Sequence, residues 1–290
     1  MKNLLITGAS GFLGWNLIRA AKSDWTIFGT YSSHPVTIPD ISLIKSDLTN
    51  FKDLKRLFDH TKLDAVIHTA AISNPNFCQE NRSDTHKINT KAPINIASFC
   101  SDLKIQCLFT SSDLVFDGLN PPYTEDDEPS PINAYGEQKA LAEEGIKERY
   151  PATVICRMPL MFGDPGPVAT SFIQPLIKAL KSIDEVNLFV DEYRTPLSGR
   201  NAAEGLMLAF KNMPPIIHLG GHEKISRFDF GRLLADVFGI RKAKLKQCKQ
   251  KDMDMPAPRP PDVSFDISKA KALGFQPNPL REELKYLMGV

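Results

Sequence analysis

The feature that most constrains the fold is a glycine-rich turn near the start of the chain. An apolar run at residues 4–6 (LLI) is followed by Gly8, Gly11 and Gly14, and apolar residues at helical spacing continue to residue 21. In such a turn Gly8 permits the tight bend, Gly11 lets the backbone approach a pyrophosphate, and Gly14 lets the helix pack against the strand. The helix start offers unpaired N–H groups and its positive dipole end to phosphate oxygens. The pattern predicts a dinucleotide-binding βαβ unit.

Short apolar runs alternate with segments of helical spacing along the first half of the chain. After residues 4–6 such runs occur at 25–29, 41–44, 65–68, 106–110, 152–156 and 216–219. Nearly continuous apolar runs are typical of parallel strands that helices cover on both faces. We therefore predict an α/β fold, a doubly wound parallel Rossmann sheet with a smaller C-terminal substrate-binding lobe.

The regular alternation weakens after about residue 158, where prolines become frequent. Residues 256–261 (PAPRPP) cannot lie inside a helix, whereas residues 226–238 have helical spacing. We predict that residues 1–158 form the NAD(P)-binding domain, with returns from about 197–238. The smaller lobe would consist of residues 159–196 and 239–290.

Composition excludes several other classes of protein. The formal net charge of the 290 residues is +1, so no broad field favours nucleic acid or an anionic membrane surface. The five cysteines show no CxxC spacing, so we expect neither a disulfide framework nor a thiolate metal site, and no metal at all. The apolar run at the start is too short for a signal peptide, and we expect a cytoplasmic protein without a membrane span.

The ribose end of the predicted cofactor site lacks the usual acid. NAD-specific sites carry Asp or Glu near the end of the second strand, whereas this chain has Tyr31, Ser32, Ser33 and His34 there. Hydroxyls and a histidine would not repel a 2′-phosphate, so NADP is favoured over NAD. The predicted dinucleotide contacts are Gly8, Ser10, Gly11, Phe12, Leu13, Gly14, Tyr31, Ser32, Ser33, Asp47 and Leu48. Asp47 would accept from the adenine amino group, or cap the helix that starts near Thr49.

A catalytic set is predicted from Ser112, Tyr135 and Lys139. Ser112 ends the fifth strand, where α/β sheets bind ligands, and Tyr135 and Lys139 lie four residues apart and so share one helix face. A lysine ammonium near a phenol would favour the phenolate and lower the tyrosine pKa from its usual value of about 10. The tyrosine could then exchange a proton with a substrate near neutral pH.

These motifs resemble the extended short-chain dehydrogenase/reductase family. TGASGFLG (7–14), HTAA (68–71), Asn89, SSDLVFDG (111–118) and YGEQK (135–139) carry the likeness. Within the family, SDLVFDG and residues 123–144 are similar to the dTDP-4-dehydrorhamnose reductases, a branch that includes regulatory subunits of methionine adenosyltransferase. The likeness runs from residue 1 to about 163 and more thinly to the end.

The resemblance implies roles for further residues. Asp113 would join the catalytic set by orienting substrate or donating a proton. Asn89 would hold the water molecule or backbone group that lies behind Lys139. Cofactor contacts would include His68, Ala70, Ala71 and Asn89, together with the catalytic Tyr135 and Lys139. Arg157 would belong to the strand near the nicotinamide, or else form a structural ion pair.

The substrate is less clearly specified. Leu114 stands where the reductases carry an aromatic residue, and RTPLS (194–198) replaces their usual GTP segment. Arg194 and Arg259 could pair with the diphosphate of a nucleotide-sugar, because guanidinium geometry suits it. We expect an NAD(P)-dependent reductase of a nucleotide-linked sugar, with homodimerisation left open. The alternatives are an NAD-dependent epimerase or dehydratase, and a non-catalytic cofactor-binding regulatory subunit.

Overall fold

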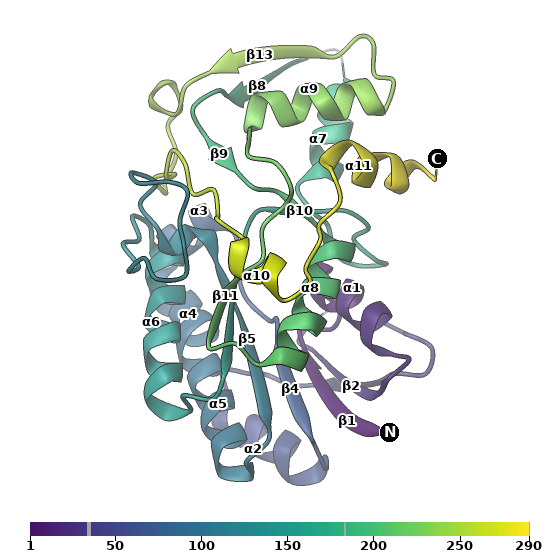
Figure 1. Ribbon diagram of the computed structural model, residues 1–290, viewed down its shortest axis with the longest axis vertical. Coiled ribbons are helices and arrows are strands. Elements are labelled where there is room, and N and C mark those ends of the chain that lie inside the picture. The colour runs from purple at the N-terminus through teal and green to yellow at the C-terminus, as the bar shows by residue number, and fades with distance from the viewer. Residues whose placement is uncertain (34–35, 183, 290) are drawn as a thin grey trace.

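The structure, a computed structural model, describes residues 1–33, 36–182 and 184–289. Its central layer is a seven-stranded sheet in the order β11-β6-β5-β4-β1-β2-β3, in which all neighbours run parallel. Figure 1 shows this sheet in the lower part of the molecule, with helices on both sides. Because successive strands are added outward in both directions from β1 and β4, the sheet is doubly wound, as predicted.

The predicted apolar runs correspond to the seven strands of this sheet. Their buried residues face helices on both sides, so these strands need not alternate between apolar and polar residues. The strands are β1 (Lys2–Thr7), β2 (Trp25–Tyr31), β3 (Ser42–Lys45), β4 (Ala65–His68), β5 (Gln106–Ser112), β6 (Val154–Met158) and β11 (Ile216–His218).

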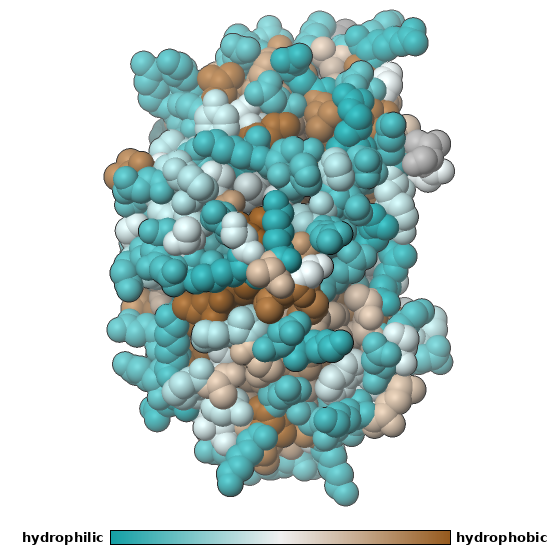
Figure 2. Space-filling model, viewed as in Figure 1, coloured by the Kyte–Doolittle hydropathy of each residue, from teal (hydrophilic) through white to brown (hydrophobic). Residues whose placement is uncertain are grey.

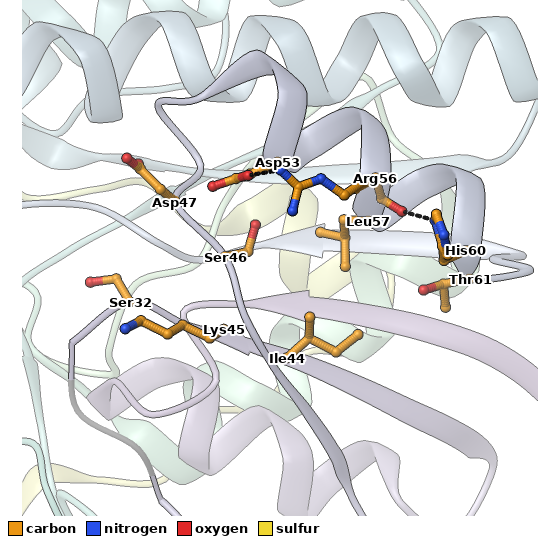
Figure 3. Close-up of a pocket in the computed structure, with 10 residues that line it drawn as sticks. All are labelled: Ser32, Ile44, Lys45, Ser46, Asp47, Asp53, Arg56, Leu57, His60 and Thr61. Atoms are coloured by element: carbon orange, nitrogen blue, oxygen red, sulfur yellow. Dashed lines mark hydrogen bonds and ion pairs between the residues drawn. The ribbon is translucent and has the colours of Figure 1, made fainter.

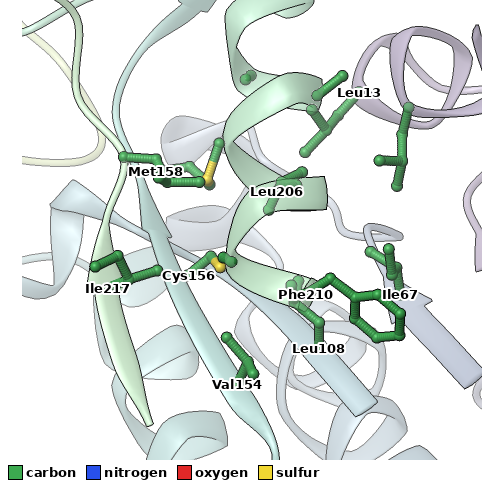
Figure 4. Packing of buried hydrophobic residues seen from close by; sticks show 14 of the residues in the cluster. Leu13, Ile67, Leu108, Val154, Cys156, Met158, Leu206, Phe210 and Ile217 are labelled. Atoms are coloured by element: carbon green, nitrogen blue, oxygen red, sulfur yellow. The ribbon is translucent and has the colours of Figure 1, made fainter. Parts of the chain in front are cut away.

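Five long helices cover the two faces of the sheet. On one face α1 (Phe12–Ala21) and α8 (Gly199–Asn212) pack on the strands, and Figure 4 shows Leu206 and Phe210 of α8 lying over β6 and its neighbours. On the other face α2 (Phe51–His60), α5 (Ala92–Leu103) and α6 (Ala134–Arg149) pack through a separate set of apolar residues. The sheet is therefore the middle of three layers.

Short helices connect β4 to α5 and close the chain. Between β4 and α5 lie α3 (Pro75–Glu80), α4 (Arg82–His86) and the π-helical turn η1 (Lys87–Lys91). A 3-10 turn, η2 (Asp113–Val115), follows β5, and another, η3 (Gln250–Asp252), follows β13 (Lys244–Cys248). Near the end of the chain α10 (Ser268–Ala272) returns to the layer of α1 and α8, because Ala270 packs in their core.

A second group of elements lies above the sheet in Figure 1. It contains three two-stranded sheets and three helices, and a core of its own that includes Phe162, Phe230 and Leu284. The elements are β7 (Met161–Phe162), α7 (Ile173–Leu180), β8 (Glu185–Phe189), β9 (Tyr193–Arg194), β10 (Leu197–Ser198), β12 (Ile225–Ser226), α9 (Arg227–Val237), β13 and α11 (Leu280–Met288).

The two cores divide the segment 197–238, which was predicted to return to the NAD(P)-binding domain. Helix α8 and strand β11 lie with the central sheet, whereas α9, also inside the predicted return at 197–238, packs with α7 and α11. The division into 1–158 with returns and a lobe of 159–196 and 239–290 stays a prediction.

The outer surface is mostly polar. Figure 2 shows hydrophilic residues over most of this face, with hydrophobic ones gathered in a band across its middle, at the height of α10 in Figure 1. None of the helices in the described parts of the chain is long and apolar enough to cross a membrane.

Candidate active site

The glycine-rich turn has the geometry that a phosphate-binding loop requires. Gly8 has a positive φ of 67°, and a Cβ there would lie 2.8 Å from the Ala70 backbone. A Cβ on Gly14 would lie 2.3 Å from the Gly8 carbonyl oxygen, so α1 starts against the turn only because residue 14 has no side chain. At Gly11 a Cβ would meet only the Gly8 oxygen, at 3.1 Å, so open space lies in front of its backbone.

A cavity of about 390 Å³ opens in front of this turn. It lies at the carboxyl ends of the strands, where doubly wound sheets bind dinucleotides. Predicted cofactor residues that line it are Gly8, Ser10, Gly11, Tyr31, Ser32, Ser33, Asp47, Leu48, Ala70 and Ala71. The residues present therefore fit a dinucleotide: a backbone cradle without side chains, hydroxyls at one end, and the start of α1 beside it.

Seven predicted contacts do not line this cavity: Phe12, Leu13 and Gly14 at the start of α1, and His68, Asn89, Tyr135 and Lys139. The Leu13 side chain is buried in the core and that of Phe12 packs against the core, while Gly14 fits against Gly8. Their contribution would come from the backbone N–H groups of the first helical turn, which have no intrahelical acceptors. The residue proposed for the 2′-phosphate, His34, lies outside the described residues, whereas Ser32 and Ser33 line the cavity.

Asp47 does not cap α2, and its predicted contact with adenine stays a prediction. Its Oδ1 atom accepts from the Thr49 backbone N–H at 2.9 Å and from the Thr49 hydroxyl at 2.7 Å. The cap of α2 is instead Asn50, whose side chain accepts from two N–H groups of the first turn. Asp47 therefore fixes the turn after β3 and still lines the cavity.

Ser112, Asp113 and Tyr135 are brought together at the end of β5. Asn133 caps α6, and Gly136 lets that helix press on the turn after β5, because a Cβ there would lie 2.0 Å from the Leu114 carbonyl oxygen. The Ser112 hydroxyl lies 3.1 Å from Asp113 Oδ1 and hydrogen-bonds Tyr135. Tyr135 is almost fully buried.

The pKa of Tyr135 moves in the direction opposite to the prediction. Burial raises it above its usual value, the charge of Asp113 raises it further, and the Ser112 hydrogen bond only partly opposes this. Lys139 does not offset the effect, because burial lowers its own pKa to about 7. Its ammonium lies 4.1 Å from the centre of the Phe109 ring and donates to the Thr110 carbonyl at 2.5 Å.

Asn89 does not reach Lys139 by any hydrogen bond in the described chain. It lies in the π-helical turn, where its side chain accepts from the Ile72 N–H at 2.9 Å and donates to the Ile72 carbonyl at 2.9 Å. It also donates to Gln138 Oε1 at 2.8 Å. Asn89 thus ties the segment after β4 to α6, one residue from Lys139, so the predicted link to the lysine is indirect.

Asp113 faces Arg194, which comes from the second group of elements. Arg194 Nε lies 3.5 Å from Asp113 Oδ2, and its Nη2 lies 3.3 Å from Glu192. Its Nη1 donates to the carbonyls of Tyr193 and Pro260. Burial raises the pKa of Asp113 to about 6, and the Arg194 charge opposes that rise.

Two further arginines gather at the same place, one of which sequence reasoning missed. The charges of Arg194 and Arg259 both lower the pKa of Arg227, and the charge of Glu192 raises it. These four charged side chains are therefore close enough to interact electrostatically. Arg259 donates to Asn76 Oδ1 at 2.8 Å. The buried Nη1 of Arg227 has no hydrogen-bond partner among the described residues. No motif surrounds Arg227, so only the fold reveals it.

Arg157 forms a structural ion pair, the second of its two predicted roles. It contacts both carboxylate oxygens of Glu143, at 2.8 to 3.2 Å, and both side chains are almost fully buried. His68 is also buried: its Nδ1 lies 2.6 Å from the Thr7 hydroxyl, and burial lowers its pKa to about 3. Within the described ranges no group of three or more His, Cys, Asp or Glu could hold a metal ion.

Comparison with known proteins places this site in a family. Residues 1–289 match the family described as RmlD substrate binding domain. The chain is 30% identical over 288 residues to a probable low-salt glycan biosynthesis reductase, Agl14, of Haloferax volcanii, covering 97% of this chain and 96% of that protein. It is 27% identical to the mouse methionine adenosyltransferase 2 subunit beta, covering 98% and 86%.

A solved structure agrees over nearly the whole chain. A hypothetical dTDP-4-dehydrorhamnose reductase from Sulfolobus tokodaii superposes with a TM-score of 0.84 and 30% identity, covering 94% of each chain. The match includes both the sheet and the elements above it, as does the family match. The chain therefore belongs to the RmlD substrate binding domain family and is an NAD(P)-dependent oxidoreductase of the extended short-chain dehydrogenase/reductase class.

Proposed function

We propose that the chain reduces a carbonyl group of a nucleotide-linked sugar, with Ser112, Tyr135 and Lys139 as the catalytic set. The observation that carries this proposal is the meeting of Ser112, Asp113 and Tyr135 at the end of β5, beside the arginines of the second group of elements. Arg194 gives one side of this site positive charge, and the dinucleotide would extend to the site from the cavity at the glycine-rich turn.

Tyr135 is suited to giving up a proton rather than taking one. Because burial and the charge of Asp113 raise its pKa, the phenol keeps its proton at neutral pH. Reduction of a carbonyl needs such a proton at the oxygen as charge develops there. Ser112 would hydrogen-bond the same oxygen and orient it. When bound, the reduced nicotinamide supplies the hydride.

Lys139 and Asp113 would set the charge around this oxygen. With a pKa near 7, Lys139 can lose or gain a proton in the working range, so it can return a proton toward Tyr135 after turnover. Asp113 Oδ2 is buried and has no hydrogen-bond partner among the described residues, apart from its ion pair with Arg194. That oxygen is available to a substrate hydroxyl.

The cofactor would lie along the cavity at the glycine-rich turn. Gly8, Ser10 and Gly11 would cradle the pyrophosphate, and Tyr31, Ser32 and Ser33 would surround the adenosine ribose. Two solved neighbours of the same fold, a reductase of Bacillus anthracis and MoeE5, hold NADP and NAD respectively. The absence of an acid after β2 favours NADP here.

The substrate diphosphate would bind at the arginine cluster. Three guanidinium groups, those of Arg194, Arg227 and Arg259, face the carboxylates of Glu192 and Asp113, so one positive charge is left over. Arg194 is largely occupied by its ion pairs and backbone acceptors. Arg227, with its unpartnered buried Nη1, is the group best placed for a phosphate oxygen.

The likeness to the methionine adenosyltransferase subunit keeps a second candidate, a cofactor-binding regulatory subunit without turnover. A panel of 4-keto nucleotide-sugars with NADPH, followed at 340 nm, separates the two, because only a reductase consumes the cofactor. Tyr135→Phe should lower kcat about 10²- to 10⁴-fold without changing NADPH affinity. Arg227→Gln should raise KM and leave NADPH affinity unchanged. Near wild-type kcat in Tyr135→Phe on the true substrate would refute the assignment.

A further inference from the structure

A second cavity adjoins the adenosine end of the dinucleotide cavity. It measures about 450 Å³ and lies between β3 and α2, and the two cavities share Ser32, Ser46 and Asp47. Figure 3 shows its lining residues. Since the ribose 2′ position is bound at the end of the second strand in such folds, a group on that position would lie next to this cavity.

The register of the sheet brings a lysine to this point. Lys45, the last residue of β3, pairs with Tyr31, the last residue of β2, which directly precedes Ser32. In Figure 3 the Lys45 ammonium and the Ser32 hydroxyl lie at the same end of the cavity, while the Asp47 carboxylate points away from them. Sequence reasoning looked for a basic residue only after β2 and therefore missed one on the neighbouring strand.

The other charged side chains that line this cavity, Asp47, Asp53 and Arg56, each have a hydrogen-bond or ion-pair partner on the protein. Arg56 lies 3.1 Å from Asp53, and Asp47 accepts from Thr49. Lys45 is exposed and forms no ion pair among the described residues. It is thus the lining cation that remains for an incoming anion.

We propose that Lys45, together with the Ser32 hydroxyl, forms the subsite for the 2′-phosphate of NADP and so sets the preference for NADP over NAD. The proposal rests on the proposed dinucleotide site. A 2′-phosphate carries close to two negative charges at neutral pH, whereas NAD has only a hydroxyl there. The ammonium and hydroxyl would each make a charge-assisted hydrogen bond with the phosphate and none of comparable strength with the hydroxyl.

The test measures dissociation constants of NADPH and NADH for the wild-type chain, Lys45→Gln and a control, Lys52→Gln. Lys52 is exposed on α2 and lines neither cavity, so the control makes the same change in net charge. A charge-assisted hydrogen bond at an exposed site is worth about tenfold in affinity. We expect Lys45→Gln to weaken NADPH about tenfold and leave NADH unchanged, and Lys52→Gln to alter neither.

Half-cofactors sharpen the result. The same variant should weaken 2′,5′-ADP, which carries the 2′-phosphate, and leave 5′-AMP unaffected. Equal weakening of NADPH and NADH in Lys45→Gln, or no change in NADPH, would overturn the proposal while leaving the dinucleotide site and the reductase function intact. Failure of the wild-type chain to bind either dinucleotide would instead refute the proposed function on which this inference depends.

Discussion

Replacing Glu143 by Gln tests how far the fold around Lys139 depends on one buried ion pair. The Glu143 and Arg157 side chains are 2% and 1% exposed, and three of their N···O distances lie between 2.8 and 3.2 Å. The guanidinium also lies 5.0 Å from the centre of the Phe116 ring and beside His218, whose Nε2 lies 3.4 Å from Nη1 and whose pKa is lowered to about 3. No other carboxylate in the described chain forms an ion pair with Arg157, although the Arg157 charge also lowers the pKa of Asp127.

The expected loss in the free energy of unfolding follows because Arg157 has no second ion-pair partner in the described chain to replace Glu143. Removing one partner of a buried pair leaves an uncompensated charge and costs about 3 to 5 kcal/mol. With a urea dependence of about 3 kcal/mol per M, the unfolding midpoint should fall by about 1 M or more. Glu143 also raises the pKa of Lys139, so the lysine of Glu143→Gln should lose its proton at lower pH than in the wild-type chain.

Urea unfolding followed by circular dichroism measures this cost. The control is Glu144→Gln, which removes the same charge from the exposed neighbouring position and should move the midpoint little. A double variant, Glu143→Leu with Arg157→Met, removes both charges and should be more stable than Glu143→Gln. The reasoning fails if Glu143→Gln behaves like Glu144→Gln, or if the double variant is no more stable than the single one.

Two further predictions concern the glycine-rich turn and Lys139. Gly11→Val should lower dinucleotide affinity, measured by nicotinamide fluorescence, with little loss of stability. Gly14→Ala should instead lower the urea midpoint of unfolding, because its Cβ would lie 2.3 Å from the Gly8 oxygen. Equal stability of the two variants would contradict this. Lys139 has a pKa of about 7 when folded and 10.5 otherwise, so the unfolded chain binds more protons between these values and wild-type stability should rise with pH across that window. Lys139→Met should flatten that rise, and an unchanged pH dependence would show that burial does not lower the pKa of Lys139 in the folded chain.

The sequence predicted most of the fold because strand identity here is carried by local patterns. Each of the seven apolar runs corresponds to a strand of the sheet, and the glycine-rich turn lies where its spacing requires. The ends of the helices were placed less well: Asp47 was offered as the cap near Thr49, whereas Asn50 caps α2. The catalytic set was likewise predicted from local patterns, since Ser112 ends a strand and Tyr135 and Lys139 lie four residues apart on one helix.

What the sequence could not supply are contacts set by strand register and by distant segments. Lys45 and Ser32 line one cavity because β3 pairs with β2 in one particular register. Arg227 joins Arg194 and Arg259 through the packing of three segments far apart in the chain. The pKa of Tyr135 was predicted to fall because its distance from Lys139 along the helix was known, while its depth of burial was not.

The position of β11 at the edge of the sheet has a consequence for how the chain is made. Its partner β6 ends at Met158, but β11 begins only at Ile216, after most of the second group of elements has been synthesised. Until then the nascent chain carries β6 as an open edge with unpaired backbone groups, which invites pairing with other chains. Strand β11 covers this edge only late in synthesis. A ribosome that stalls between these two strands would therefore release a product prone to aggregation.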